Sequence, residues 1–246
     1  MFGEYAVVAA LAIIAFAGSI LFGLTGFGSA LITIPLATHV VPLPFALALF
    51  ALVDLANALR IGLENPANAV RNEWTRLVPM ILAGTVVGVT LLVNLPRRAG
   101  MAALGGFILA YALYSLVRPE PSSTIARGWA WVAGFTGGIT STLFGAGGPP
   151  YAIYLSQRGL TKEQFRATLG FATVTSISLR VTAFLVTGLL LDPNVWMAAL
   201  VVLPAAWLGI SAARRVFLRV SRAALLRAVA LMLLASGASL VARSLG

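Results

Sequence analysis

Uncharged runs long enough to cross a membrane dominate this sequence, and they constrain its fold more than any motif. Of all residues, 60% are hydrophobic and only 10% are charged. A water-soluble protein of this composition could not bury all of its apolar side chains in a core. Strands of a membrane barrel would alternate apolar and polar residues, and that alternation is absent. We therefore predict an all-α polytopic membrane protein. Five runs of about 20 residues or more carry no charge: Tyr5–Thr38, Leu77–Leu95, Ala99–Val117, Gly128–Gln157 and Pro193–Ala213.

Three further runs, Pro44–Leu63, Ala167–Leu191 and Ala223–Ala242, have the same character but contain one or two charges. The formal charge of +10 sits in the loops beside the apolar runs, where it indicates topology and contact with anionic lipid. We therefore expect the lipid bilayer as a partner and no nucleic acid. With no cysteine and a single histidine, the sequence predicts no metal site and no cofactor.

The chain repeats itself at a long interval. Phe16, Gly18, Gly26 and Gly28 each recur 119 residues later, as Phe135, Gly137, Gly145 and Gly147. A shift of 125 residues places "PMILAG", from Pro79, on "PAAWLG", from Pro204. We predict two homologous transmembrane halves, residues 1–118 and 129–246, joined by a linker at 119–128 that is rich in turn-forming residues.

Each half has a long broken hydrophobic segment, then a helix with polar residues at its centre, then two plainer helices. If the broken segment re-enters, each half has three full spans and the repeat is inverted; if it crosses, there are eight spans and a parallel repeat. The positive-inside rule favours the inverted arrangement, which places most of the 17 basic residues in the cytoplasm. Both termini are then expected in the periplasm, with the protein in a bacterial inner membrane.

The breaks are the first candidate site. In the second half, glycines are expected to end one half-helix and "PP" to begin another inside the membrane; "GFGSA" does the equivalent in the first half. A half-helix N-terminus at membrane depth offers N–H groups and a positive dipole to an anion. The alternative is that these glycines only allow close helix packing. The candidate binding residues are Gly26, Gly28, Ser29, Gly145, Gly147, Gly148 and Pro149.

Polar residues in the helix after each break extend this site. Arg180 falls near the middle of its span, where a charge normally faces a cavity, and Thr173 and Ser176 share its helical face as hydrogen-bond donors. Alternatively, Arg180 has a purely structural role, in which it pairs with Asp54 or with backbone carbonyl groups. In the first half Asp54 is a candidate for proton coupling, as is His39 at the expected end of the half-helix, a residue that also fits the membrane interface. The supporting polar residues are Asn57 and Arg60.

The paired motifs "FGLTGFGSALITIPL" and "TSTLFGAGGPPYAIYL", each followed by a polar-centred helix, resemble the sulfite exporter TauE/SafE family of bacterial membrane proteins. The resemblance covers nearly the whole chain and implies export of sulfur-containing anions such as sulfite and organosulfonates. It carries the glycine motif over to the residues named above. Phe27 and Ser29 stand where the family often has a richer glycine run.

These observations predict a secondary transporter of a small anion that works by alternating access, with its site between the halves near the membrane midplane. Its energy is expected from a gradient of protons, sodium ions or the substrate, because no nucleotide-binding loop is present. The alternative functions are a passive channel and a structural membrane partner. The sequence leaves open whether the protein forms a homo-oligomer. An intramembrane enzyme using Asp54, His39 and Ser141 is disfavoured, since their spacing forms no nucleophile–base pair.

Overall fold

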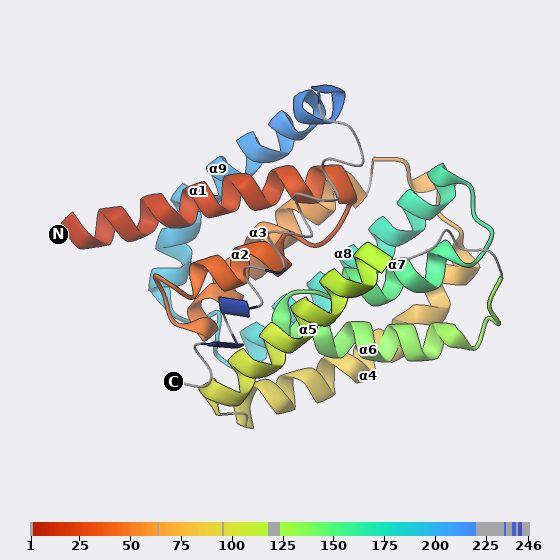
Figure 1. Cartoon of the computed structure of the whole chain (residues 1–246), viewed down its shortest axis with the longest axis horizontal. Coiled ribbons are helices and arrows are strands. Elements are labelled where there is room, and N and C mark those ends of the chain that lie inside the picture. Colours follow the sequence, from red (N-terminus) through yellow and green to blue (C-terminus); the bar gives the residue numbers. More distant parts are fainter. Residues whose placement is uncertain are drawn as a thin grey trace.

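The computed structural model describes residues 2–62, 64–94, 96–117 and 124–219, with single positions 234, 238, 239, 241 and 242. All regular elements within these residues are helices. The expected last span, 223–242, and the first part of the linker lie outside the described ranges. The helices are α1 (Phe2–Thr25), α2 (Ala30–Ala37), α3 (Leu43–Gly62), the 3₁₀ turn η1 (Pro66–Asn68), α4 (Arg71–Asn94), α5 (Arg97–Val117), α6 (Trp129–Phe144), α7 (Gly148–Ser156), α8 (Lys162–Val186) and α9 (Pro193–Arg219) (Figure 1).

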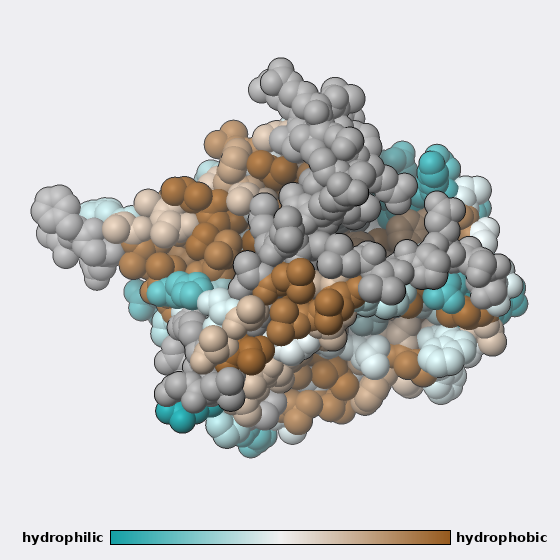
Figure 2. Space-filling model, in the orientation of Figure 1, coloured by the Kyte–Doolittle hydropathy of each residue, from teal (hydrophilic) through white to brown (hydrophobic). Residues whose placement is uncertain are grey.

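Five of these helices are long and apolar enough to cross a membrane, namely α1, α3, α4, α8 and α9. Their outward faces remain apolar: Val186 is 83% exposed and Leu200 is 76% exposed. Where residues are coloured in Figure 2, hydrophobic ones occupy the middle of the face in view and hydrophilic ones lie toward both of its ends. The chain is therefore an all-helical membrane protein, as the uncharged runs predict.

Both broken segments fold back on themselves. A methyl group on Gly18 of α1 would lie 2.1 Å from Thr33 Cγ2 of α2, so α2 returns along α1. In the second half, a methyl group on Gly137 of α6 would lie 2.1 Å from the ring of Tyr151 in α7. Each pair is thus a helical hairpin, closed by glycines that replace side chains at the contact.

The reversals use glycine in two different ways. Gly26, Gly28 and Gly145 have φ of 79°, 89° and 70°, the left-handed region expected of them. Gly148 and Gly147 are expected to share this role, but Gly148 has no positive φ and Gly147 has φ of −72°. Gly147 is needed for space, because an added methyl group would lie 2.8 Å from Ser141 Cβ. Pro149 lies in the first turn of α7, as predicted.

Long helices from the N-terminal part of the chain pack against helices from its C-terminal part. α1 runs parallel to α9, where a methyl group on Gly209 would lie 2.3 Å from the Phe16 carbonyl oxygen. α4 runs parallel to α6, where a methyl group on Gly84 would lie 2.2 Å from the Phe135 carbonyl oxygen. Between these pairs α3 and α8 cross antiparallel, with Gly62 against Gly170.

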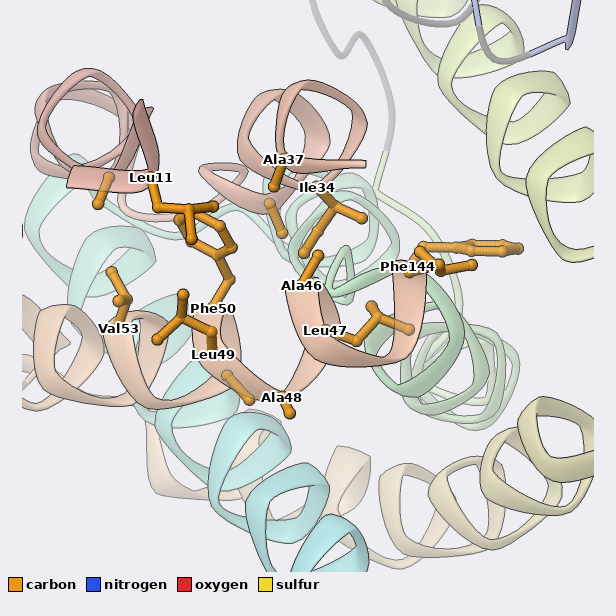
Figure 3. Close-up of a cluster of buried hydrophobic side chains, with 14 of the residues drawn as sticks. Leu11, Ile34, Ala37, Ala46, Leu47, Ala48, Leu49, Phe50, Val53 and Phe144 are labelled. Carbon is orange, nitrogen blue, oxygen red and sulfur yellow. The ribbon is translucent and has the colours of Figure 1, made fainter. Parts of the chain in front are cut away.

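α2 is enclosed by this arrangement. Its residues have no polar face, and seven of the eight are buried. Figure 3 shows Ile34 and Ala37 of α2 beside Leu11 of α1 and above Phe50 of α3, with Phe144 of α6 at the edge of the same cluster. The apolar core therefore holds the first hairpin at the centre of the protein, next to the second one.

Candidate functional site

The two breaks meet at the centre of the protein. A methyl group on Gly148 would lie 2.4 Å from Phe27 Cβ, and one on Gly145 would lie 2.6 Å from Ala30 Cβ. Phe27 and Ala30 belong to the first break and the glycines to the second, although 115 or more residues separate them in the sequence. The first half has a bulky Phe27 in place of a glycine because Gly148 leaves room for its side chain.

A buried ion pair lies beside this junction. Arg180 of α8 is 1% exposed, and its Nη2 donates to Asp54 Oδ2 of α3 at 2.9 Å. Asp54 is also 1% exposed. An unpaired charge at such a position costs several kcal/mol, so each residue stabilises the other. The pairing expected as the structural role of Arg180 is therefore present.

Each member of the ion pair also binds one of the breaks. Arg180 Nη1 donates to the carbonyl oxygen of Ser141, in the last turn of α6, at 3.1 Å. Asp54 Oδ1 accepts a hydrogen bond from Ser29 Oγ, at the start of α2, at 2.6 Å. The pair therefore links the central helices α3 and α8 to both hairpins.

Gly145 is tightly constrained by this network. Its φ of 70° favours glycine, and a methyl group there would lie 2.8 Å from Arg180 Nη1. The residue therefore shapes the second break and leaves room for the guanidinium group.

The other candidate residues of α8 lie on the same face as Arg180. Ser176 is 1% exposed and its Oγ accepts from the hydroxyl of Tyr151 at 3.0 Å. Thr173 is 5% exposed. Thr173 Oγ1 and Arg180 Nε have no hydrogen-bond partner among the described residues. A bound ligand or a water molecule would satisfy these two buried donors.

A small cavity lies next to the ion pair: Asp54, Thr173 and Ser176 line it, whereas Arg180 itself does not. About 10 Å³ of it is open to the centre of a water molecule, which is room for about one water. The structure is thus closed around its polar groups. Both half-helix starts reach the cavity, and Pro149 does not line it. The lining residues are Phe22, Phe27, Gly28, Ser29, Asp54, Ser141, Gly145, Gly147, Gly148, Tyr151, Thr173, Ser176 and Ile177.

The remaining sequence candidates lie outside this cavity. Gly26 lines a neighbouring one. Asn57 donates to Ser19 Oγ at 2.9 Å and ties α3 to α1. Arg60 donates to the Trp207 carbonyl oxygen at 3.2 Å and lies over the Trp207 ring, which ties α3 to α9. His39 is exposed beyond the end of α2, away from the buried carboxylate, so the two proton-coupling candidates are not brought together.

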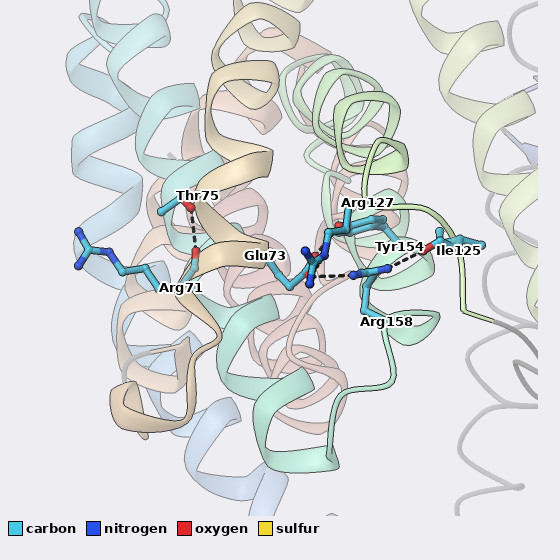
Figure 4. Close-up of polar contacts among 7 residues, drawn as sticks. All are labelled: Arg71, Glu73, Thr75, Ile125, Arg127, Tyr154 and Arg158. Carbon is cyan, nitrogen blue, oxygen red and sulfur yellow. Dashed lines mark hydrogen bonds and ion pairs between the residues drawn. The ribbon is translucent and has the colours of Figure 1, made fainter.

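Sequence reasoning missed Tyr151. Its hydroxyl group was the available signal, because a tyrosine inside an uncharged membrane run needs a hydrogen-bond partner. It also missed a charged cluster around Glu73 of α4, which is 5% exposed (Figure 4). Glu73 accepts from Tyr154 and from Arg158 Nη2, the latter at 3.0 Å, and lies 4.0 Å from Arg127.

This Glu73 cluster fastens the second hairpin. Tyr154 is in α7 and Arg158 in the loop after it, and Arg158 also donates to the Ile125 carbonyl oxygen before α6. The hydrogen bond to Glu73 raises the pKa of Arg158, so this side chain stays a cation at any physiological pH. No group of three metal-ligating side chains occurs in the part of the chain that the structure describes.

Comparison with known proteins identifies the family of this chain. The family model described as "Sulfite exporter TauE/SafE" matches residues 10–240. Over 166 residues, 67% of this chain and 69% of the relative, the chain is 26% identical to the probable inner membrane transporter protein TsaS of Comamonas testosteroni. Over 170 residues, 65% of each chain, it is 29% identical to the probable sulfite/organosulfonate exporter TauE of Cupriavidus necator.

The second of these matches spans less than two thirds of the relative's own length. No solved structure matches the chain. The family match covers nearly the whole sequence and includes both breaks, both polar-centred helices and the Arg180–Asp54 pair. The chain belongs to the sulfite exporter TauE/SafE family of membrane proteins.

Proposed function

We propose that this protein is a secondary transporter of a small sulfur-containing anion, sulfite or an organosulfonate, and that it works by alternating access. The observation that carries the proposal is Arg180, a buried cation at the junction of two helix breaks with an unpartnered Nε among the described residues. An oxyanion is the ligand that a guanidinium group binds best, through paired N–H···O bonds. The family description and the name of the Cupriavidus necator relative supply the sulfur chemistry.

Arg180 and its neighbours would bind the anion from several sides. Thr173 Oγ1 is a second unpartnered donor, and the starts of α2 and α7 bring the positive ends of two helix dipoles to the cavity. Because the cavity holds about one water, the anion requires the hairpins to separate. A site that must open before it can bind is typical of a carrier and not of a continuously open channel.

Asp54 competes with the anion for the same guanidinium group. Protonation of Asp54 would weaken its pairing with Arg180 and leave the guanidinium group to the substrate. Loss of that proton would favour release of the anion. This exchange would couple anion movement to protons through Asp54, the buried one of the two candidates, while a sodium-coupled mechanism would leave Asp54 ionised throughout.

We further infer that the two halves form an inverted repeat. The shifts of 119 and 125 residues map Phe16 on Phe135 and Gly84 on Gly209. The Gly84–Phe135 and Gly209–Phe16 contacts are therefore the same contact with the halves exchanged. The returning hairpins support re-entrant segments over the eight-span alternative. Positive-inside counting then places both termini in the periplasm, with the protein in the inner membrane.

Anion flux into proteoliposomes tests the proposed function. Replacing Arg180 alone leaves Asp54 buried and unpaired, so the informative variant is the double one, Arg180→Gln with Asp54→Asn, which removes both charges. We expect it to insert and fold, and to lose anion binding by about tenfold or more, because a hydrogen bond to a charged group contributes roughly 1.5–3 kcal/mol.

Arg98→Gln is the matched control, since Arg98 is exposed at the start of α5. Saturable organosulfonate flux in the parent and the control, with flux at low substrate concentration lower by about tenfold or more in the double variant, supports the proposal. Undiminished flux in the folded double variant would remove Arg180 from the site. Flux that does not saturate would favour a passive channel.

A further inference from the structure

A row of three cavities leads from the Arg180 site to the surface. The outermost is a vestibule with ≈ 780 Å³ open to water-sized molecules, and the next is an inner chamber with ≈ 30 Å³. The site cavity follows. The vestibule is lined by the ends of α1 and α3, by the loop after α3, and by α8 and α9: Gly23, Leu24, Arg60, Ile61, Gly62, Glu64, Asn65, Asn68, Glu163, Arg166, Ala167, Ile210, Ser211 and Ala213.

Neighbouring cavities share lining residues, so they lie next to one another. Ile61, Gly62 and Arg166 line both the vestibule and the inner chamber. Phe22 and Thr173 line both the inner chamber and the site cavity. A molecule that passes Thr173 therefore meets its unpartnered hydroxyl group before it reaches Arg180.

Charge along this route changes with depth. The vestibule has two arginines and two glutamates, among them Arg166 and Glu64, which form a half-exposed pair at 3.8 Å. Such an exposed pair is weak and opens readily. Arg166 is the charged residue among those that line the inner chamber, and neither glutamate reaches it. The charge on the walls thus becomes purely positive one step inside the vestibule, which favours anions.

An apolar constriction separates the inner chamber from the site. Phe22 is 2% exposed and packs with Ala58, Ile177 and Ile210. Beside it α3 and α8 cross closely, since a methyl group on Gly170 would lie 2.7 Å from Gly62 Cα. Movement of α1 relative to this crossing would open the constriction.

The vestibule opens at the strongly basic end of the protein. The loops that join α3 to α4 and α7 to α8 lie at the same end in Figure 1, and the Val70 amide donates to Thr168 Oγ1 between them. Glu73 binds Arg158 at this end and lies beside Arg127. The positive-inside rule assigns this end to the cytoplasm.

We propose that the anion passes between the cytoplasm and the Arg180 site through this vestibule, with Arg166 as the guiding cation and Phe22 as the barrier. This inference rests on the proposed transport function and adds its route and its side of loading. The vestibule delivers a substrate to Arg180 from the cytoplasm, which is the loading side of an exporter.

The absence of cysteine from the sequence makes a direct test available. Single variants Ile61→Cys and Asn68→Cys place a thiol in the vestibule, and Asn194→Cys places one at the start of α9, at the opposite end. Each is treated with a membrane-impermeant sulfonated maleimide in inside-out and right-side-out vesicles. Transport of a radiolabelled organosulfonate is then measured.

We expect both vestibule thiols to react only when the cytoplasmic face is exposed, and their adducts to block transport. Asn194→Cys should react only from the other face. Excess organosulfonate should slow labelling of Ile61→Cys. Reaction of Ile61→Cys from the periplasmic face alone, or full transport after complete labelling, would overturn the route. A different result would contradict the proposed transport function itself: the untreated parent protein would then transport no organosulfonate.

Arg166 is tested by Arg166→Gln and Arg166→Lys. Loss of the guiding charge should lower the flux at low substrate concentration by about tenfold, with little effect at saturation, and lysine should restore most of it. An equal loss at saturating substrate, or no rescue by lysine, would contradict a guiding role.

Discussion

At the scale of single residues, the centre of the protein depends on close approach. Arg180 Nη1 donates to the Ser141 carbonyl oxygen in space that a methyl group on Gly145 would enter, at 2.8 Å from Nη1. A charged group inside a membrane is stabilised by such short, fixed contacts, since no solvent replaces them. The guanidinium group is therefore packed closely against a glycine in the break between α6 and α7.

Gly145→Ala tests this dependence, and Gly159→Ala is its matched control. Both glycines have similar φ, 70° and 66°, so this backbone conformation should cost alanine about 1–2 kcal/mol at each position. Gly145→Ala should lose more stability than this, because its methyl group would also lie 2.6 Å from Ala30 Cβ. Only at Gly145 would the methyl group meet Arg180, because the nearest atom at Gly159 is 3.9 Å away. We expect both variants to melt earlier, but only Gly145→Ala to lose thermal stabilisation by organosulfonate. Equal stabilisation in both would contradict the role given to Gly145.

The residues that sequence could identify are those whose chemistry conflicts with a membrane. Arg180 and Asp54 stood out as charges at mid-span, and Asp54 was named as a counter-ion. The breaks stood out as glycine and proline in apolar runs. Gly147 was assigned to backbone freedom, whereas its role is packing against Ser141. Such contacts join segments far apart in the sequence, so local pattern carries no record of them.

At the scale of elements, the second hairpin is fastened at its open end as well as at its tip. Tyr154 and Arg158 bind Glu73 on α4, while Gly145 and Gly148 pack against the first hairpin. Glu73 was not expected, because near the start of a membrane helix a glutamate is indistinguishable from an ordinary interfacial charge. Its partners Tyr154 and Arg158 are far away in the sequence, and only the fold brings them next to Glu73.

Glu73→Gln should destabilise the protein by roughly 3 kcal/mol, since breaking a buried pair leaves Arg158 without its counter-charge. The matched control is Glu64→Gln. Glu64 is 50% exposed and lies 3.8 Å from Arg166, so its loss should cost less than about 1 kcal/mol. Thermal unfolding of the detergent-solubilised variants measures both effects. Similar melting temperatures for the two would show that the Glu73 cluster is not a structural clamp.

At the scale of the whole molecule, the helices pair across the halves. α1 packs on α9 and α4 on α6, so neither half buries its small-residue faces alone. The helix order and the two breaks could be predicted from the sequence. The packing of α1 on α9 and of α4 on α6 could not be predicted. The internal sequence similarity shows which residues correspond to one another, but not which residues are in contact.

The crossed pairing predicts equal responses at equivalent glycines. In Gly84→Ala and Gly209→Ala the methyl group would lie 2.2 and 2.3 Å from a backbone carbonyl oxygen, which a rotamer change cannot relieve. Each variant should therefore lose about 1–3 kcal/mol, seen as matching falls in melting temperature. Gly106→Ala in α5 is the control, because no described atom lies within 4 Å of its added methyl group. If only one of the two variants melted early, the interfaces would not be equivalent, and the inverted repeat would lose its structural support.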